Sequence, residues 1–276
     1  MVGSKKQQAF PTREQGKGLS SGMEVSLDLP GIAWTLVRTD FKTRYYGSVL
    51  GFLWTLLNPI IIFVTLVTIF SFLFSSHESY GISLIIGLFI WDYFSEGSAT
   101  GLMSLFTKGY LATKVKFPSW LLIATSSSNA LLRLMVFSVS IMIYVMISRG
   151  FPGLDRILLY LLYMICLYFM VLGISLTTSL LFLWFRDLNQ IWAVILQAGF
   201  FVAPIIYPLE ILPEKYHFYL YLWPPTVIIQ FSRAILLAYP VPTLTGHLCL
   251  VSMTMFIFII GFITYRFLHY RAVERL

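Results

Sequence analysis

The first pattern in the chain is a helical repeat of hydrophobic positions between residues 29 and 45. These positions recur every three or four residues, which is the spacing of one face of an α-helix. Arg38, Lys42 and Arg44 lie beside that face. Such a helix lies on a membrane surface with its cations toward the lipid head groups, so we predict an interface helix over residues 29–46 in contact with membrane lipids. Its apolar face consists of Leu29, Ile32, Ala33, Leu36, Val37, Phe41 and Tyr45.

Long stretches that are poor in charged residues follow the interface helix as far as the C-terminus. Residues 52–74 contain no Asp, Glu, Lys or Arg. At a rise of about 1.5 Å per residue, this stretch covers the roughly 30 Å hydrocarbon layer of a bilayer with some tilt. We predict an all-α integral membrane protein that forms a single domain over residues 29–276 with six transmembrane helices. The predicted spans are 52–74, 82–106, 120–147, 157–184, 188–207 and 246–268.

The composition is that of a membrane protein and excludes a water-soluble one. Hydrophobic residues make up 58% of the chain, charged residues 11%, and the mean hydropathy is +0.82. A soluble domain with these values would expose apolar patches far larger than soluble proteins tolerate. Residues 1–28 are polar by contrast and lack the apolar core of a cleavable secretory signal. We expect this segment to be a disordered cytoplasmic tail.

Lys and Arg residues are unevenly divided between the two sides of the predicted membrane domain. With six spans, fourteen of them lie on the side of both termini and four lie on the other side. Because Lys and Arg are enriched in cytoplasmic segments, we expect both termini in the cytoplasm. The same bias, together with contact with acidic lipids, accounts for the net charge of +7. We therefore expect no nucleic-acid partner.

Proline residues interrupt the chain after the fifth predicted span. Pro204 and Pro208 close that span, and three more prolines precede residue 226. Residues 226–238 are mostly apolar, but they are too few to cross about 30 Å of hydrocarbon. Two structures remain open for this region. It forms re-entrant helices that border a pathway on the outer side, or a helical cap on the outer surface.

Three charged residues fall inside predicted spans, where charge is expensive unless it is paired or functional. Asp92 and Glu96 are four residues apart and share a helix face, and Arg133 lies at a similar depth on the next, antiparallel span. We expect an intramembrane ion pair between these two helices. A polar lining and a proton relay are the alternatives. If Arg133 pairs with Glu96, exchanging the two residues should restore assembly that either single change disrupts.

Aromatic residues make up 17% of the chain and crowd the connector between the fifth and sixth spans. In that connector they are Tyr207, Tyr216, Phe218, Tyr219, Tyr221, Trp223 and Tyr239. Rings at this position form an ordinary interfacial belt, or they stack against the C–H faces of sugars that pass through. A sugar track would continue along the first and fifth spans. Its candidates there are Trp54, Phe63, Phe70, Phe200 and Phe201.

Motifs for enzyme chemistry or cofactor binding are not evident in the sequence. The only Gly-Lys pair, Gly16-Lys17, lies in the polar tail and does not form a phosphate-binding loop, so this chain is not expected to bind ATP. The four His residues are scattered, and the two Cys residues lie in separate spans, which favours neither a metal site nor a disulfide. We expect no cofactor. A membrane-embedded glycosyl- or acyltransferase would need an intramembrane His or paired acids that face a cleft, and Asp92 and Glu96 are the only candidates.

Three stretches in order along the chain together resemble one family. They read RTDFKTRYYGSVLGFLWTLLNPII, KGYLATKVKFPSWLL and RDLNQIWAVILQAGFFVAPIIYP. They are similar to the interface helix with first span, the coupling loop and the fifth span of the membrane subunits of the second class of ABC exporters. The similarity is closest to exporters of O-antigen, capsule and teichoic acid polysaccharides, and it extends from about Leu29 to the C-terminus. One departure is Pro224, where the family usually has Asn.

The resemblance implies the transmembrane subunit of an ATP-driven exporter in the bacterial inner membrane, and not an enzyme. Two copies of the chain would form a homodimer whose first and fifth spans line a conduit. Two copies of a separate ABC ATPase subunit would dock on the cytoplasmic face. The implied substrate is a lipid-linked polysaccharide such as O-antigen, and the alternative is a drug or a small lipid.

The resemblance also implies roles for individual residues. The cations of the interface helix would gather the pyrophosphate of the substrate from the inner leaflet. The conduit would be closed at rest by an outer gate around Phe201, Pro204 and Tyr207, because an open pore would dissipate the proton gradient. The loop between the second and third spans would couple the chain to the ATPase. The candidate coupling residues are Lys114, Phe117 and Pro118.

Overall fold

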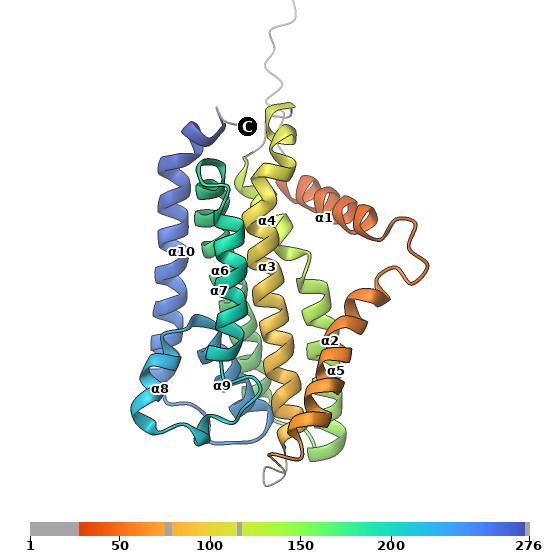
Figure 1. The fold of residues 1–276 in the computed structure, drawn as a ribbon, viewed down its shortest axis with the longest axis vertical. Coiled ribbons are helices and arrows are strands. Elements are labelled where there is room, and N and C mark those ends of the chain that lie inside the picture. Colours follow the sequence, from red (N-terminus) through yellow and green to blue (C-terminus); the bar gives the residue numbers. More distant parts are fainter. Residues whose placement is uncertain (1–27, 75–78, 115–117, 274–276) are drawn as a thin grey trace, which may run out of the picture.

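The protein, seen in a computed structural model, is a bundle of helices joined by short connectors (Figure 1). The structure describes residues 28–74, 79–114 and 118–273, so the predicted tail lies almost entirely outside the described residues. No strand occurs in these described ranges, which confirms the all-α class. The helices in chain order are α1 (Leu29–Tyr45), α2 (Leu53–Phe70), α3 (Tyr80–Lys114), α4 (Trp120–Ser128), α5 (Leu131–Arg149), α6 (Leu154–Trp184), α7 (Leu188–Val202), the 3-10 helix η1 (Leu209–Ile211), α8 (Glu214–Tyr221), α9 (Pro224–Leu236) and α10 (Leu244–Val273).

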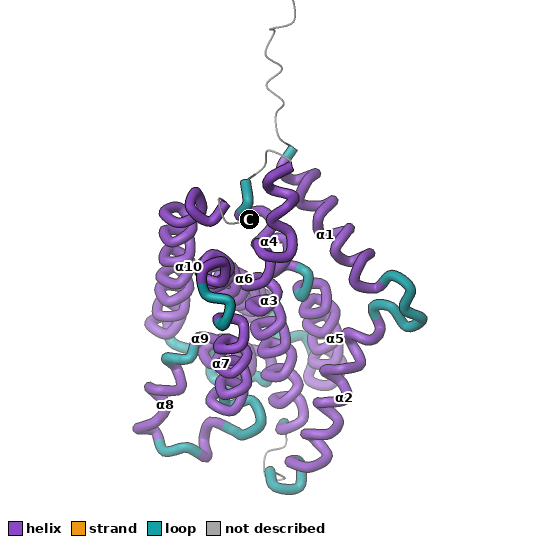
Figure 2. The backbone as a smooth tube through the Cα atoms, turned by 45° about the horizontal axis from the view of Figure 1, so that its top comes forward, coloured by secondary structure: helices purple, strands orange, loops and turns teal. Residues whose placement is uncertain are grey.

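The long helices α3 and α6 form the centre of the bundle. Both contact α4, α7 and α9, and α6 packs most extensively against α10. Figures 1 and 2 show α1 and α2 diverging from the bundle on one side, joined by a loop that projects outward. The short helices α8 and α9 lie at the end of the bundle opposite the C-terminus (Figure 1). We call the end with the C-terminus the inner end and the end with α8 and α9 the outer end.

Helix α1 covers nearly the predicted range, but the apolar face that the sequence analysis placed on the membrane surface packs against the bundle. The side chain of Asp28 accepts a hydrogen bond of 3.0 Å from the amide of Gly31, which satisfies one free donor of the first turn. The predicted apolar face is the half-buried one, while Trp34, Arg38 and Lys42 are exposed. No residue of α1 is fully buried. This helix therefore rests on the bundle rather than inside it.

Four stretches of the described residues are long and apolar enough to cross a membrane. They are Leu53–Phe70, Trp120–Arg149, Leu154–Trp184 and Leu244–His269. Helix α3 is long enough, at 35 residues, but carries Asp92 and Glu96 in its middle. The 15 residues of α7 cover only about 22 Å. The six-span count thus stays a prediction for these two helices.

The third predicted span, 120–147, is not one continuous helix. It breaks between α4 and α5 at Asn129 and Ala130. The residues before the break are Thr and Ser, and their hydroxyls bond back to carbonyls of the preceding turn, as Ser128 does to Ala124 at 2.6 Å. Such bonds compete with the helical ladder and bend helices. The polar run TSSSN therefore interrupts the span in the middle of an apolar stretch.

The fifth predicted span, 188–207, is shorter than expected. Helix α7 ends at Val202, and residues 203–207 are not helical. Pro204 explains this end, because a proline lacks the amide donor and disfavours helix at the residue before it. Ala203 accordingly has an extended backbone, with φ −68° and ψ 130°.

Helix α9 corresponds to the short apolar segment predicted at residues 226–238. It is buried along most of its length and contacts α3 and α6. The more exposed α8 precedes it at the outer end. The re-entrant position of this pair in a membrane stays a prediction.

Helices α6 and α10 approach each other closely at Gly173 of α6. A Cβ atom at Gly173 would lie 2.7 Å from the backbone of Ile257 and Phe258 on α10, closer than packed atoms come. Only glycine fits there, because the obstructing atoms are backbone and cannot rotate away. The pairing of these two long helices thus depends on a missing side chain.

We predict that Gly173→Ala lowers the free energy of unfolding by about 1–3 kcal/mol, the usual cost of overpacking. Thermal unfolding of the protein in detergent measures this as a lower midpoint. Gly81→Ala is the matched control, because a Cβ atom there meets only a side-chain carbon of Val67 at 3.7 Å. Equal midpoints for the two variants would show that α10 shifts freely against α6.

Candidate functional site

A cluster of charged residues connects α3 with α5 in the middle of the bundle. The Nε atom of Arg133 on α5 lies 2.6 Å from Oδ2 of Asp92 on α3. The guanidinium also donates from Nη2 to Glu96, one turn further along α3. Arg133 is buried, with its side chain 8% exposed. The structure thus brings together the three charged residues that the sequence analysis placed inside predicted spans.

Glu96 binds a second arginine, from α1. Nη1 of Arg44 donates to Oε1 of Glu96, while Oε2 is taken by Arg133. The sequence assigned Arg44 to lipid head groups, but its side chain reaches this carboxylate instead. Arg38 and Lys42 remain exposed on α1, and the structure records no ion pair for either among the residues it describes.

A second ionic contact ties α1 to α3 nearer the inner end. Lys108 of α3 donates to the carboxylate of Asp40 on α1 and also to the hydroxyl of Ser126 on α4, at 2.8 Å. Asn129, at the break after α4, donates to the same oxygen of Asp40 at 3.0 Å. Sequence reasoning missed this contact, although one signal was available. Asp40 is the only acid within residues 29–46 and falls on the predicted apolar face.

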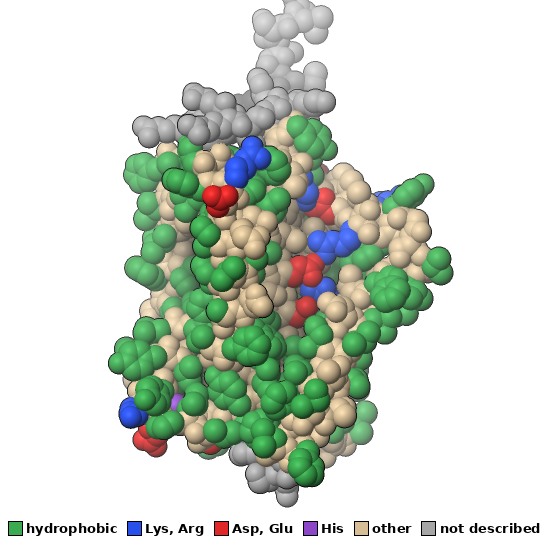
Figure 3. All heavy atoms as spheres, viewed as in Figure 1, with side chains coloured by type: hydrophobic (Ala, Val, Ile, Leu, Met, Phe, Trp, Pro, Cys, Tyr) green, Lys and Arg blue, Asp and Glu red, His purple; other side chains and the backbone are tan. Residues whose placement is uncertain are grey.

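The charges of these contacts cancel. The cluster holds three carboxylates and three cations. Figure 3 shows acidic and basic side chains gathered where α1 approaches the bundle. A balanced and hydrogen-bonded cluster avoids most of the penalty of burying charge. We call these six residues the charge cluster; they are Asp40, Arg44, Asp92, Glu96, Lys108 and Arg133. The cluster attaches α1 to the bundle, although α1 contributes no buried side chain.

Asp92 also borders a cleft between α2, α3 and α7. The cleft has a volume of about 380 Å³ and combines polar with aromatic and aliphatic groups. Oδ2 of Asp92 is held by Arg133, whereas Oδ1 has no recorded partner in the part of the chain that the structure describes. A carboxylate in this state accepts hydrogen bonds from a ligand. The lining residues are Asn58, Pro59, Ile62, Leu88, Trp91, Asp92, Ser95 and Phe200.

An aromatic cluster forms the wall of this cleft at its outer side. Trp91 packs its ring edge to face with Phe200 of α7, with centroids 5.9 Å apart, and lies 6.3 Å from Trp223 at the start of α9. Gly199 allows this approach, because a Cβ atom there would lie 2.5 Å from the Trp223 ring. At the inner side, Trp192 of α7 donates to Ser98 of α3 at 3.1 Å. These contacts position α7 along α3.

The five aromatic residues proposed for a sugar track do not share one surface. Phe200 lines the cleft, and Trp54 and Phe201 are exposed on α2 and α7. Phe63 instead lines an apolar groove between α2, α3 and α5, and Phe70 stacks on Phe74.

Side chains satisfy the irregular backbone after α7. Arg233 of α9 is 4% exposed and donates to the carbonyls of Ser83, Pro204 and Ile205, at 2.9, 2.6 and 2.9 Å. Tyr80 donates to the carbonyl of Ile206 at 2.8 Å. Non-helical backbone can lie in a membrane domain only where its polar groups are satisfied in this way.

The residues of the predicted gate lie in or next to this segment. Pro204 is buried, whereas Phe201 is exposed. The hydroxyl of Tyr207 donates to the carbonyls of Phe201 and Val202, at 3.1 and 3.2 Å, and so caps the C-terminus of α7.

The predicted coupling residues lie at the inner end of α3 and just beyond it. Lys114 is the last residue of α3, and Phe117 falls outside the described residues. Pro118 leads into α4, which Tyr265 of α10 holds by hydrogen bonds to Ser119 at 2.8 Å and to the amide of Trp120 at 3.1 Å.

Comparison with known proteins finds one family and several relatives. Residues 33–237 match the family described as ABC-2 type transporter. An O-antigen export system permease protein RfbA of Myxococcus xanthus is 30% identical over 187 residues, which cover 67% of this chain and 71% of that protein. Two RfbA permeases of Klebsiella pneumoniae are 26% and 28% identical over 182 and 185 residues, covering 66% of this chain and 70% of each relative.

The charge cluster changes what an exchange of Glu96 and Arg133 should do. An arginine at position 96 would face Arg44, and a glutamate at position 133 would face Asp92. We predict that the double exchange destabilises the protein at least as much as either single change does. The expected loss in the free energy of unfolding is up to about 3 kcal/mol. This is the low end of the cost of breaking a buried ion pair, because Glu96 is partly exposed.

Thermal unfolding in detergent measures this outcome. Lys42→Gln, which removes an exposed cation of α1, is the control and should keep the wild-type midpoint. A double exchange that unfolds like the wild type would mean that Glu96 and Arg133 pair independently of their neighbours.

Proposed function

The chain belongs to the ABC-2 type transporter family, and from this premise we propose that it exports a lipid-linked, O-antigen-like polysaccharide across the bacterial inner membrane. It is a multi-pass membrane transport subunit that works with an ABC ATPase, and not an enzyme. The substrate class is supported by the three relatives, each named as an O-antigen export permease.

The cleft between α2, α3 and α7 is the structural observation that best supports a glycan substrate. It offers the free carboxylate oxygen of Asp92, the amide of Asn58 and the hydroxyl of Ser95 beside the ring of Phe200. Sugars present hydroxyls around their edge and C–H groups on their faces, so they suit a surface that mixes acceptors, donors and rings. A conduit for purely apolar molecules would have no use for these polar groups.

The conduit itself is proposed to form between two copies of the chain. Helix α2 supports this, because only 6% of its apolar stretch is buried, against 44% for α6. Helix α7 likewise exposes Ile191, Val194 and Phe201. Both helices border the cleft, so a second copy that covers them would enclose it. In this arrangement α2 and α7 are the first and fifth of six spans.

The inner end of the bundle is proposed to face the cytoplasm and to dock two ATPase subunits. The end of α3, the start of α4 and the C-terminus all lie there (Figure 1). Helix α1 would lie at the cytoplasmic surface of the membrane, where the exposed cations Arg38 and Lys42 attract the substrate's pyrophosphate. Arg44 would hold α1 in place through Glu96. The coupling loop, with Phe117 as an apolar knob, would transmit ATPase movement to α3 and α4.

We predict that a bacterium lacking this protein loses surface polysaccharide and accumulates lipid-linked polymer inside, and that the wild-type gene restores export. Phe117→Ala should fail to restore it and should weaken association with the ATPase by about tenfold or more, because apolar anchors of an interface contribute 2 kcal/mol or more. Immunoblots of surface polymer and co-purification with the ATPase measure the two effects.

The control for this experiment is Phe151→Ala, an exposed phenylalanine in the connector at the outer end. It should restore export and retain the ATPase. Normal surface polymer in the deletion strain would contradict the proposed function. Normal export with Phe117→Ala would contradict only the coupling role.

The outer gate is proposed to close by the exposed side of α7 near Phe201, supported by the irregular segment behind it. We predict that Phe201→Ala lets small ions leak through reconstituted dimers, because a smaller side chain leaves a wetted gap at a hydrophobic constriction. Ion flux into proteoliposomes measures the leak. Phe185→Ala, in the connector between α6 and α7 at the inner end, is the matched exposed control. A tight bilayer with normal export by Phe201→Ala, Pro204→Ala and Tyr207→Ala would rule out the gate.

A further inference from the structure

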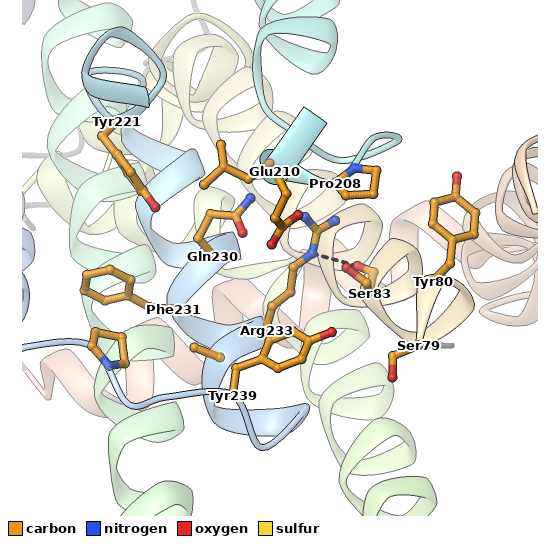
Figure 4. A pocket seen from close by; sticks show the side chains of 13 residues that line it. Ser79, Tyr80, Ser83, Pro208, Glu210, Tyr221, Gln230, Phe231, Arg233 and Tyr239 are labelled. Carbon is orange, nitrogen blue, oxygen red and sulfur yellow. Dashed lines mark hydrogen bonds between the residues drawn. The ribbon is translucent and has the colours of Figure 1, made fainter. Parts of the chain in front are cut away.

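A second polar pocket lies at the outer end, inside a single copy of the chain and away from the proposed conduit. Its volume is about 320 Å³, at the lower end of the range of small-molecule pockets, about 300–1,000 Å³. Segments from α3, η1, α8 and α9 surround it (Figure 4). A pocket of this size suits a ligand as small as one sugar unit, and not a polymer.

The pocket is lined by one acidic and one basic side chain, Glu210 and Arg233, so its net charge is zero. Figure 4 shows the carboxylate of Glu210 and the guanidinium of Arg233 directed toward one another. Arg233 uses three of its five N–H donors to bind the carbonyls of Ser83, Pro204 and Ile205. Its position is therefore fixed by the backbone, and it supplies positive potential to the pocket. The pocket has no net charge to attract an anion or a cation.

Several polar groups of the pocket are nevertheless free to bind a ligand. Nε2 of Gln230 is buried without a hydrogen-bond partner, and no hydrogen bond is recorded for the carboxylate of Glu210 within the described residues. Tyr221 directs its hydroxyl toward Gln230 (Figure 4). Phe231 and Tyr239 add aromatic rings to the lining. A buried unsatisfied amide is costly, so a polar ligand at this position would be stabilising.

We propose that this pocket binds one neutral pyranose unit at the outer face of the protein. The sugar's hydroxyls donate to Glu210 and accept from Gln230, while its C–H face lies on the aromatic rings. The assignment to a neutral sugar rests on the size of the pocket, its zero net charge and its mix of polar groups and rings. The source of that sugar rests on the proposed function. It would be the end or a branch of the polysaccharide that emerges from the conduit.

The test is binding of methyl hexopyranosides to the purified full-length protein in lipid nanodiscs. Saturation-transfer NMR with the methyl glycosides of glucose, mannose and galactose should detect binding of at least one. Glu210→Gln and Gln230→Met should each weaken that binding about tenfold, because a hydrogen bond that involves a charged or buried group contributes about 1.4 kcal/mol or more. Glu214→Gln on α8 is the matched control, because Glu214 is exposed and does not line the pocket; its binding should equal that of the wild type.

Three results would overturn the proposal. They are no binding of any of the three glycosides, equal binding by the wild type and both pocket variants, and displacement of the glycoside by tetramethylammonium, which would identify a cation site. The measurement uses neither ATPase nor transport, so it is independent of the export assay. If the glycosides do not bind but export is intact, only the sugar-binding proposal is overturned. If the glycosides bind but the wild-type protein does not export polysaccharide, only the proposed function is overturned.

Discussion

A single carboxylate, Glu96, joins three helices by binding two arginines at once. Arg44 comes from α1 and Arg133 from α5, and each takes one oxygen of the carboxylate. Removing Arg133, the buried partner, would leave Asp92 without its counter-charge and Glu96 with Arg44 alone. Two features of the inner half of the bundle depend on this pairing. Helix α1 can lie against the bundle without a buried side chain, and Asp92 retains one oxygen for the cleft because Arg133 is shared.

The outer half obeys a different constraint, the satisfaction of backbone carbonyls. Helix α7 stops at Pro204, and the chain that follows has no helical ladder. Arg233 and Tyr80 replace that ladder with side-chain donors, and Tyr207 caps the end of α7. These donors come from α9, from α3 and from the irregular segment itself. The irregular segment is therefore held by hydrogen bonds where it faces α3 and α9, while Phe201 at the end of α7 stays exposed.

Hydrophobic periodicity and counts of residues predicted much of this architecture. They placed the apolar helices, identified the residues of the apolar face of α1, and gave the equal depth of Asp92, Glu96 and Arg133, because depth along a helix is proportional to residue number. They did not predict that this face of α1 packs against the bundle. They did not predict the second partner of Glu96 or the contact between Asp40 and Lys108. Those pairings depend on how α1 folds back on α3, which periodicity does not encode. The break at Asn129 was missed because hydrophobicity averages conceal a short polar run. The end of α7 was expected at Pro204 or Pro208, and the structure ends the helix just before the first of them.

The position of Glu96 along the chain has a consequence for biosynthesis. A growing chain emerges from its N-terminus, so Arg44 is made first, Glu96 second and Arg133 last. Arg44 of α1 is thus available to pair with Glu96 before the segment that carries Arg133 has been made. The later arrival of α5 completes the cluster and locks α1, α3 and α5 in one arrangement.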